Sequence, residues 1–149
     1  MASIKLSAIR LVIVALADVG TEITLSAYKK DSLQGDSILS KVYKQLGVET
    51  VFNENEIQLC KVSDMKPETL NLELANAPDI AQTIAVTCFG LGIGCHLTGL
   101  HTLKIKETDR LEALKIELSK LGATLSVSEK DLTLQPSSNI KSEVAIDTY

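Results

Sequence analysis

Two amphipathic helices are predicted by apolar residues that recur at helical spacing. Four leucines at i, i+3, i+7 and i+10 share one helix face, namely Leu111, Leu114, Leu118 and Leu121. A similar stripe lies earlier in the chain, at Ile38, Leu39, Val42, Tyr43 and Leu46. Each stripe is followed directly by a glycine, Gly47 or Gly122. Because glycine readily adopts the left-handed conformation that terminates helices, we expect both helices to end there.

A β-hairpin is predicted after each helix, because two short runs follow it across a polar linker. Apolar and polar residues alternate within each run, as they do in a strand with one buried face. The runs are 50–53 and 57–60 with linker 54–56, and 124–128 and 132–135 with linker 129–131.

These segments belong to an internal repeat. Gly20-Thr21-Glu22-Ile23-Thr24-Leu25 is echoed further along the chain by Gly94-Cys95-His96-Leu97-Thr98-Gly99. Leu46-Gly47 is echoed at nearly the same offset by Leu121-Gly122. The period of about 75 residues is too long for a solenoid unit, and it indicates a duplicated small α/β module.

The apolar segments 9–17 and 80–91 occupy equivalent places in the repeat. The first is rich in β-branched residues and by itself fits a buried strand, but the second is too long for a typical strand. The equivalence favours a buried helix for both. Each unit is then predicted to run strand, helix, strand, helix, strand, strand (βαβαββ), in an α/β (α+β) fold. We expect units at 1–62 and 63–136 and the start of a third at 137–149.

Composition favours a compact intracellular domain. The chain has 149 residues, of which 45% are hydrophobic and 23% charged, values typical of a globular protein. A net charge of -4 argues against a nucleic-acid binder but allows a few cations to hold a small anion. The spacing of the three cysteines fits no zinc or disulfide framework and indicates a reducing cytosol. The apolar run 11–17 is too short to span a bilayer, so we expect a soluble, cytoplasmic protein.

The strongest candidate for chemistry is the segment 103–111, where a strand is predicted to pass into a helix. Lys106 and Arg110 are four residues apart and flank Glu107, so a helix start there would bring two cations and a carboxylate together. Such a site suits an anionic substrate that also needs proton transfer. The alternative is a solvated charge cluster that caps the helix. Flanking cations lower the pKa of a carboxyl, so catalysis by Glu107 requires bound anions that neutralise them.

Asp79 and two histidines carry weaker signals. Asp79 with Gln82 three residues later resembles a capping box, and capping explains Asp79 about as well as a position in a catalytic cleft does. His96 and His101 are five residues apart in a strand-like run and would point to opposite faces. We therefore interpret them as ordinary strand residues and expect no metal.

Three motifs resemble one enzyme family. Pro78-Asp79 with Thr83-Ile84-Ala85, then Lys106-Glu107-Thr108-Asp109-Arg110-Leu111, then Leu121-Gly122-Ala123 resemble the C-terminal lobe of the 5-enolpyruvylshikimate-3-phosphate synthases. The resemblance runs from about residue 21 to 149, and the Lys-Glu-Thr-Asp-Arg string separates this family from the UDP-N-acetylglucosamine enolpyruvyl transferases. It implies the enolpyruvate transferase fold, in which each lobe has three βαβαββ units.

The resemblance also implies a reaction and roles for five residues. The enolpyruvyl group of phosphoenolpyruvate passes to the 5-hydroxyl of shikimate 3-phosphate, and phosphate is released, with no metal or organic cofactor. Glu107 would transfer a proton at the methylene carbon, and Asp79 would hold the shikimate hydroxyls and act as base. Lys106 would contact the shikimate phosphate, and Arg110 would clamp the phosphoenolpyruvate carboxylate. Thr102 stands in the substrate site where the family often has asparagine.

Departures from the family pattern lead us to expect that this chain is a fragment, inactive by itself. An Asp-His-Arg string that the family has next would follow residue 149, and the N-terminal lobe, an expected partner within the same polypeptide, is absent. Residues 3–10 do not reproduce the family's Asp-Ser-Ala-Ser-like start. The alternative function is a non-catalytic βαβαββ module that binds RNA or a protein. The net negative charge of the chain and its lack of tryptophan argue against RNA binding.

Overall fold

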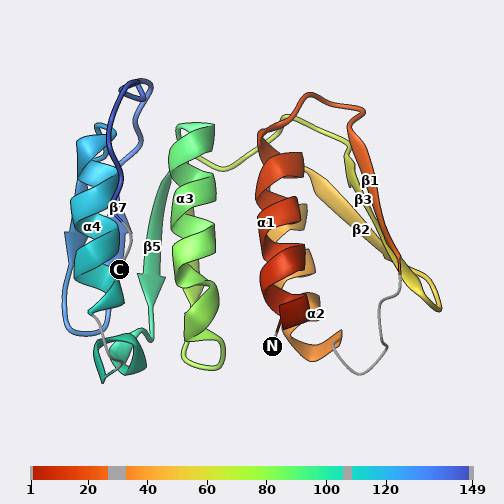
Figure 1. The fold of residues 1–149 in the computed structure, drawn as a ribbon, viewed down its shortest axis with the longest axis horizontal. Helices are drawn as coiled ribbons and strands as arrows, with labels where there is room; N and C mark the ends of the chain where they lie inside the picture. The colour runs from red at the N-terminus through yellow and green to blue at the C-terminus, as the bar shows by residue number, and fades with distance from the viewer. Residues whose placement is uncertain (1, 27–32, 106–108, 148–149) are drawn as a thin grey trace. The chain divides into compact units, whose positions relative to one another are not determined.

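A computed structural model describes residues 2–26, 33–105 and 109–147 of the chain. The chain divides into two compact units, Met1–Pro67 and Glu68–Tyr149, which we call unit 1 and unit 2. Each unit combines two α-helices with a small sheet, and the two helices lie beside each other (Figure 1).

Unit 1 is a three-stranded antiparallel sheet with helices packed on one face. Its elements in order are α1 (Ala2–Leu16), β1 (Glu22–Ser26), α2 (Leu33–Lys44), β2 (Val48–Phe52) and β3 (Glu56–Lys61). The strand order is β1-β3-β2, so β3 is central. Alternate residues of β3 are buried, among them Ile57 and Leu59, and α1 contacts this strand. The predicted helix and hairpin of this unit are confirmed.

One part of the expected order in unit 1 is wrong. The described part of this unit begins with α1 and holds no strand ahead of it, so its order is αβαββ instead of βαβαββ. The helical interpretation of 9–17 is confirmed. The physical reason is burial: Leu11, Val14 and Ala15 fall on one helix face and are almost fully buried against the rest of the unit, an arrangement that outweighs the β-propensity of the segment.

Unit 2 has the full predicted order. Its elements are β4 (Thr69–Glu73), η2 (Pro78–Ile80), α3 (Ala81–Leu91), β5 (Gly94–Thr98), η3 (His101–Ile105), α4 (Arg110–Lys120), β6 (Leu125–Val127) and β7 (Leu132–Leu134), where η denotes a 3-10 helix. The strand order is β4-β5-β7-β6. β4 and β5 are parallel and the other pairs antiparallel. The parallel pair is joined through α3, the crossover that such a pair requires.

The cores of the two units follow the predicted stripes. In unit 1 the α2 stripe provides Leu39, Tyr43 and Leu46, each with no exposed surface. In unit 2 Leu111 is fully buried and Leu118 is 5% exposed, whereas Leu114 of the same stripe is only half-buried. Both helices are followed by the expected left-handed glycine, Gly47 with φ of 82° and Gly122 with φ of 101°.

A buried lysine distinguishes the core of unit 1 from that of unit 2. Lys61 is the last residue of β3, and Leu134 is the last residue of the equivalent strand β7. Each follows a buried leucine by two residues, Leu59 in β3 and Leu132 in β7. Lys61 is only 2% exposed, and its ammonium donates to the carbonyls of Ala15 and Leu46, both at 2.9 Å. These carbonyls lie at the C-terminal ends of α1 and α2, where a cation is favourable. Burial nevertheless lowers the pKa of Lys61, and the nearby Asp64 opposes this shift.

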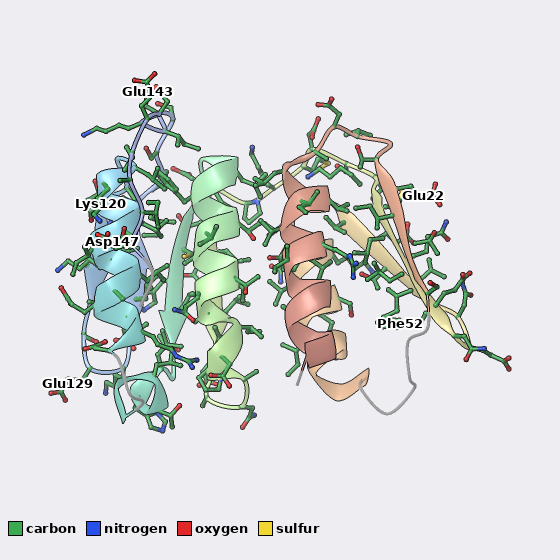
Figure 2. The ribbon with its side chains drawn as sticks, in the orientation of Figure 1. Glu22, Phe52, Lys120, Glu129, Glu143 and Asp147 are labelled. Carbon is green, nitrogen blue, oxygen red and sulfur yellow. The ribbon has the colours of Figure 1, made fainter. Side chains whose placement is uncertain are left out.

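Residues 136–147 carry no helix or strand, and an ion-pair cluster holds their end against α4. Lys120 donates to Asp147 Oδ2 at 2.7 Å and to Glu117 Oε2 at 2.9 Å, and the Asp147 amide donates to the same Glu117 oxygen at 3.1 Å. Lys120 and Asp147 are labelled in Figure 2. The hydrogen bonds to the two carboxylates raise the pKa of Lys120. The assignment of this segment to a third repeat unit stays a prediction.

Two further findings bear on the composition. None of the helices in the described part of the chain has the length and apolar character of a membrane span. The three cysteines carry free thiols. Cys88 and Cys95 are fully buried, and a hydrogen bond to Cys95 together with burial raises the pKa of Cys88, which keeps this thiol protonated.

Candidate active site

Asp79 and Arg110 meet at one edge of unit 2 although they are far apart in sequence. Asp79 lies in η2, which follows β4, and Arg110 is the first residue of α4, which follows β5 and η3. Arg110 Nη1 is 3.4 Å from Asp79 Oδ1, and the two side chains are 41% and 64% exposed. Because β4 and β5 are parallel, both segments emerge at the carboxyl ends of their strands, where α/β folds commonly bind ligands.

Local structure explains the position of Asp79. Pro78 begins η2, a place where proline is favoured because it has no N–H to leave unpaired. The N-cap of α3 is Ile80, which makes no side-chain capping hydrogen bond, and Asp79 lies one residue ahead of it in η2.

Gly99 allows the strand ends to approach each other. It has φ of 79°, and a Cβ at this position would lie 2.3 Å from Glu73 Oε1 and 2.5 Å from the Ala75 amide nitrogen. Glu73 Oε1 accepts a hydrogen bond from that amide at 2.8 Å, which organises the turn that leads towards Asp79. Gly99 had no role assigned to it from the sequence. The signal available was a glycine directly after an alternating strand.

Arg110 is held by the start of α4. Asp109 is the N-cap, and its Oδ1 accepts a hydrogen bond from the Glu112 amide at 3.1 Å. The next residue, Leu111, is fully buried and anchors the first turn in the core. The guanidinium of Arg110 therefore projects from a fixed helix start. Lys106 and Glu107 lie outside the described residues, so their predicted places in this site stay predictions.

Thr102 lies in η3, which contacts η2. Its hydroxyl oxygen is buried, and within the described ranges it has no hydrogen-bond partner. An unsatisfied buried polar group costs about 1–3 kcal/mol, so such groups are often explained by a ligand or a function. The neighbouring Leu103 is fully buried and fixes the segment. Three of the five predicted site residues therefore lie in neighbouring segments. Asp79 lies in η2, Thr102 lies in η3, which contacts η2, and Arg110 begins α4.

The electrostatics of the site leave the guanidinium available to a ligand. An exposed ion pair contributes at most about 1 kcal/mol, so the contact between Arg110 and Asp79 is weak. A guanidinium has five N–H donors and can hold a carboxylate through two of them while it keeps another partner. Within the described residues no group of three metal-binding side chains was found.

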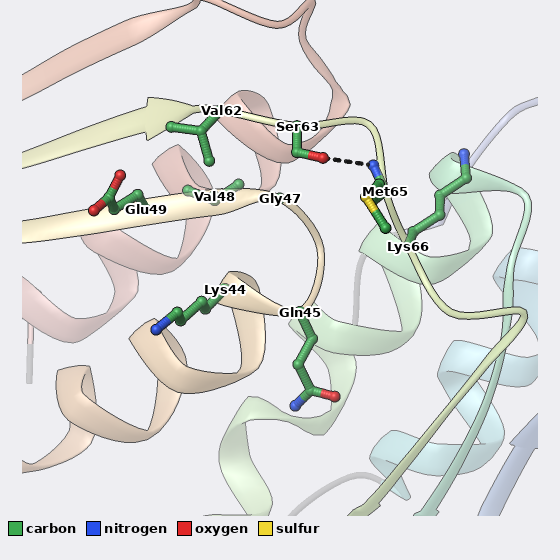
Figure 3. A pocket seen from close by; sticks show the side chains of 9 residues that line it. All are labelled: Lys44, Gln45, Gly47, Val48, Glu49, Val62, Ser63, Met65 and Lys66. Carbon is green, nitrogen blue, oxygen red and sulfur yellow. Dashed lines mark hydrogen bonds between the residues drawn. The ribbon is translucent and has the colours of Figure 1, made fainter.

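An open groove of about 480 Å³ lies elsewhere, in unit 1 (Figure 3). It is bounded by the end of α2, the start of β2 and the chain after β3, and Lys44, Glu49 and Met65 are among its lining residues. None of the five predicted site residues lines it. Its cations do not converge on one point, since Lys44 and Lys66 extend in different directions (Figure 3).

Comparison with known proteins identifies the family. The family model for EPSP synthase (3-phosphoshikimate 1-carboxyvinyltransferase) matches residues 5–149. A 3-phosphoshikimate 1-carboxyvinyltransferase of Bacteroides fragilis is 45% identical over 104 residues, which are 70% of this chain and 25% of the relative. One from Neisseria meningitidis is 27% identical over 129 residues, 87% of this chain and 30% of the relative.

A solved structure has the same fold. EPSP synthase from Acinetobacter baumannii matches with a TM-score of 0.67 at 16% sequence identity, over 94% of this chain and 33% of that protein. The mixed α/β architecture is therefore that of the enolpyruvate transferases, and this chain belongs to the EPSP synthase family. It spans a quarter to a third of the length of these relatives.

Proposed function

We propose that this chain is part of a cytoplasmic enolpyruvyl transferase that joins phosphoenolpyruvate to shikimate 3-phosphate and releases phosphate. The observation that carries the proposal is the meeting of Asp79 and Arg110 at the carboxyl ends of β4 and β5, in a chain of the EPSP synthase family. Both substrates are anions. The reaction requires an arginine that binds the carboxylate of phosphoenolpyruvate and a protein carboxylate that binds the hydroxyls of shikimate 3-phosphate.

The chemistry divides into an addition and an elimination. In the addition, the 5-hydroxyl oxygen of shikimate 3-phosphate attacks the central carbon of phosphoenolpyruvate while the methylene carbon takes up a proton. In the elimination, the methyl group loses a proton and the phosphate leaves, which restores the double bond. One group must accept the hydroxyl proton and another must supply the carbon-bound proton, and their roles reverse in the second step.

We assign these roles to residues of unit 2. Asp79 holds the shikimate hydroxyls and accepts the proton, and Glu107 transfers the proton at the methylene carbon. Arg110 clamps the phosphoenolpyruvate carboxylate through two N–H donors, and Lys106 contacts the shikimate phosphate. The unpaired hydroxyl of Thr102 donates to a substrate oxygen. These five residues need no metal or organic cofactor.

The chain alone is expected to be inactive. Domain closure around both substrates excludes water in enzymes of this kind, and an N-terminal lobe of the same polypeptide would supply the second wall. We assign 1–62 and 63–136 to two repeats of the C-terminal lobe and 137–149 to the start of the third. No observation favours the alternative of an RNA-binding or protein-binding module.

A segment exchange tests the proposal. The chain replaces the corresponding part of the C-terminal lobe of the Bacteroides fragilis relative, and phosphate release from the two substrates is measured. The hybrid should release phosphate, whereas the 149-residue chain alone should not. Arg110→Ala should lower kcat/KM for phosphoenolpyruvate about 100-fold or more, because each charge-assisted hydrogen bond contributes about 1.5–3 kcal/mol. Lys115→Ala, on the same helix, serves as the matched control. A folded hybrid without phosphate release refutes the proposal.

A further inference from the structure

The turn between β4 and η2 determines where the Asp79 carboxylate lies. The hydrophobic core holds this segment only at its two ends, at Leu74 and Ile80, which are 3% and 8% exposed. The residues between them are exposed or half-buried, and Asp79 is itself exposed. Burial of apolar surface therefore fixes the ends of the segment, and the path of the chain between them depends on hydrogen bonds.

Backbone hydrogen bonds hold both ends of the turn. The Leu74 amide donates to the Thr98 carbonyl at 2.9 Å, which continues the parallel pairing of β4 with β5. The Ala77 amide donates to the Leu74 carbonyl at 3.0 Å, which closes a four-residue turn. The Ile80 amide then donates to the Ala77 carbonyl at 3.3 Å and joins the turn to η2.

A side chain holds the middle of the turn. The Ala75 amide donates to Glu73 Oε1 at 2.8 Å, so the last residue of β4 bonds to the backbone two residues further on. This hydrogen bond lies against Gly99, the residue after β5, where a Cβ would be 2.3 Å from Oε1 and 2.5 Å from the Ala75 nitrogen. The Glu73 carboxylate thus keeps the turn at 74–77 close to the chain that leads into η3.

Arg110 has a separate support. It begins α4, whose first turn is held by the Asp109 cap and by the buried Leu111. Neither of these residues belongs to the turn at 74–77. Asp79 and Arg110, whose side chains are 3.4 Å apart, are therefore positioned by different parts of unit 2.

We propose that Glu73 is a positioning residue for the reaction of shikimate 3-phosphate. By holding the turn at 74–77 it sets the place of the Asp79 carboxylate, which binds the shikimate hydroxyls and accepts the proton. Glu73 has no part in the binding of phosphoenolpyruvate, which depends on Arg110. The inference rests on the proposed function. Its physical basis is orientation, since a displacement of about 1 Å at a reacting group can lower the rate about 100-fold.

Steady-state kinetics of the hybrid enzyme test this role. Glu73→Ala should lower kcat/KM for shikimate 3-phosphate about tenfold or more and change KM for phosphoenolpyruvate less than about twofold, because only Asp79 loses its orientation. Glu73→Gln keeps an acceptor oxygen of the same reach, so its kcat/KM should stay within about threefold of the unaltered hybrid. Glu68→Ala is the matched control, because it removes an exposed glutamate at the other end of β4.

Amide hydrogen exchange in the chain alone tests the turn independently of any activity. Glu73→Ala should accelerate exchange at Ala75 and Ala77 about tenfold or more, since the turn loses the bond that holds its middle. Exchange at Leu74, whose amide bonds to β5, should change little. Glu73→Gln should keep the amides of the turn protected.

Several outcomes overturn the proposal. Unchanged exchange at Ala77 in Glu73→Ala means that the turn does not depend on this side chain, and unchanged kcat/KM means that the turn does not position Asp79. Equal losses of kcat/KM in Glu73→Ala and Glu73→Gln mean that the charge of Glu73 acts directly. A parallel rise of KM for both substrates means a general disturbance of the site.

Failure of the proposed function is recognised separately. In that case the unaltered hybrid releases no phosphate whichever residue stands at position 73, and the role of Glu73 in the reaction is refuted with it. Failure of the present inference alone leaves an active hybrid whose kinetics do not depend on Glu73.

Discussion

Replacement of Gly47 by alanine should destabilise this protein far more than the same change at Gly122. The two glycines occupy equivalent places after α2 and α4 and both have positive φ. Their surroundings differ, because a Cβ on Gly47 would lie 1.9 Å from the Ser63 carbonyl oxygen and 2.9 Å from the Ser63 carbonyl carbon. A Cβ on Gly122 would meet nothing closer than 3.5 Å, at the Asn139 carbonyl oxygen and the Lys141 side chain.

The magnitudes follow from these geometries. Alanine in a left-handed conformation costs about 1–2 kcal/mol, partly offset by a loss of entropy in the unfolded chain, so Gly122→Ala should cost about 1 kcal/mol. Gly47→Ala adds the displacement of a backbone carbonyl, comparable to overpacking at about 1–3 kcal/mol. The total is about 3 kcal/mol, and the difference between the variants is about 2 kcal/mol, roughly a 30-fold change in the ratio of folded to unfolded protein.

Urea unfolding followed by circular dichroism measures both variants against the unaltered chain. Hydrogen exchange should also place the loss of protection for Gly47→Ala near Val62, whose amide donates to the Gly47 carbonyl at 2.9 Å. Equal destabilisation by the two substitutions would refute the reasoning, because it would mean that positive φ alone decides the effect and that the contact with Ser63 relaxes freely.

Three further substitutions are expected to give distinct results. Since the folded-state pKa of Lys61 is lowered, the unfolded chain binds more protons between that pKa and 10.5, so the free energy of unfolding should rise with pH in this window. In urea unfolding at several pH values, the free energy of unfolding should rise less steeply with pH for Lys61→Met than for the unaltered chain. An equal dependence on pH would contradict the lowered pKa of Lys61. Thr102→Val should raise the free energy of unfolding by about 1 kcal/mol, because it removes an unpaired hydroxyl, and destabilisation would reveal a partner. Lys120→Met should accelerate exchange of the Asp147 amide, with Lys115→Met as the control, and equal exchange would show that the ion pairs do not hold this segment.

Local pattern alone predicted much of the fold. The α4 stripe that ends at Gly122 and the hairpin at 124–135 depend on contacts between residues near in sequence, and such contacts leave a readable period. The repeat extended these predictions to unit 1 and correctly made 9–17 a helix. The sequence motifs also identified the family, and Lys106 and Glu107 are assigned to the site from these motifs only.

Features that join distant segments required the tertiary structure. The pairing of Asp79 with Arg110 depends on the parallel alignment of β4 and β5, and no local period encodes which strands become neighbours. The burial of Lys61 could not be predicted from the sequence either, because a lysine at the end of a strand is usually exposed to solvent. Here its ammonium is buried because carbonyls at the ends of two helices accept its hydrogen bonds. The sequence by itself thus determined most of the elements and the family. Only the tertiary structure decided which polar groups meet, because these contacts depend on chain segments brought together by the burial of apolar surface.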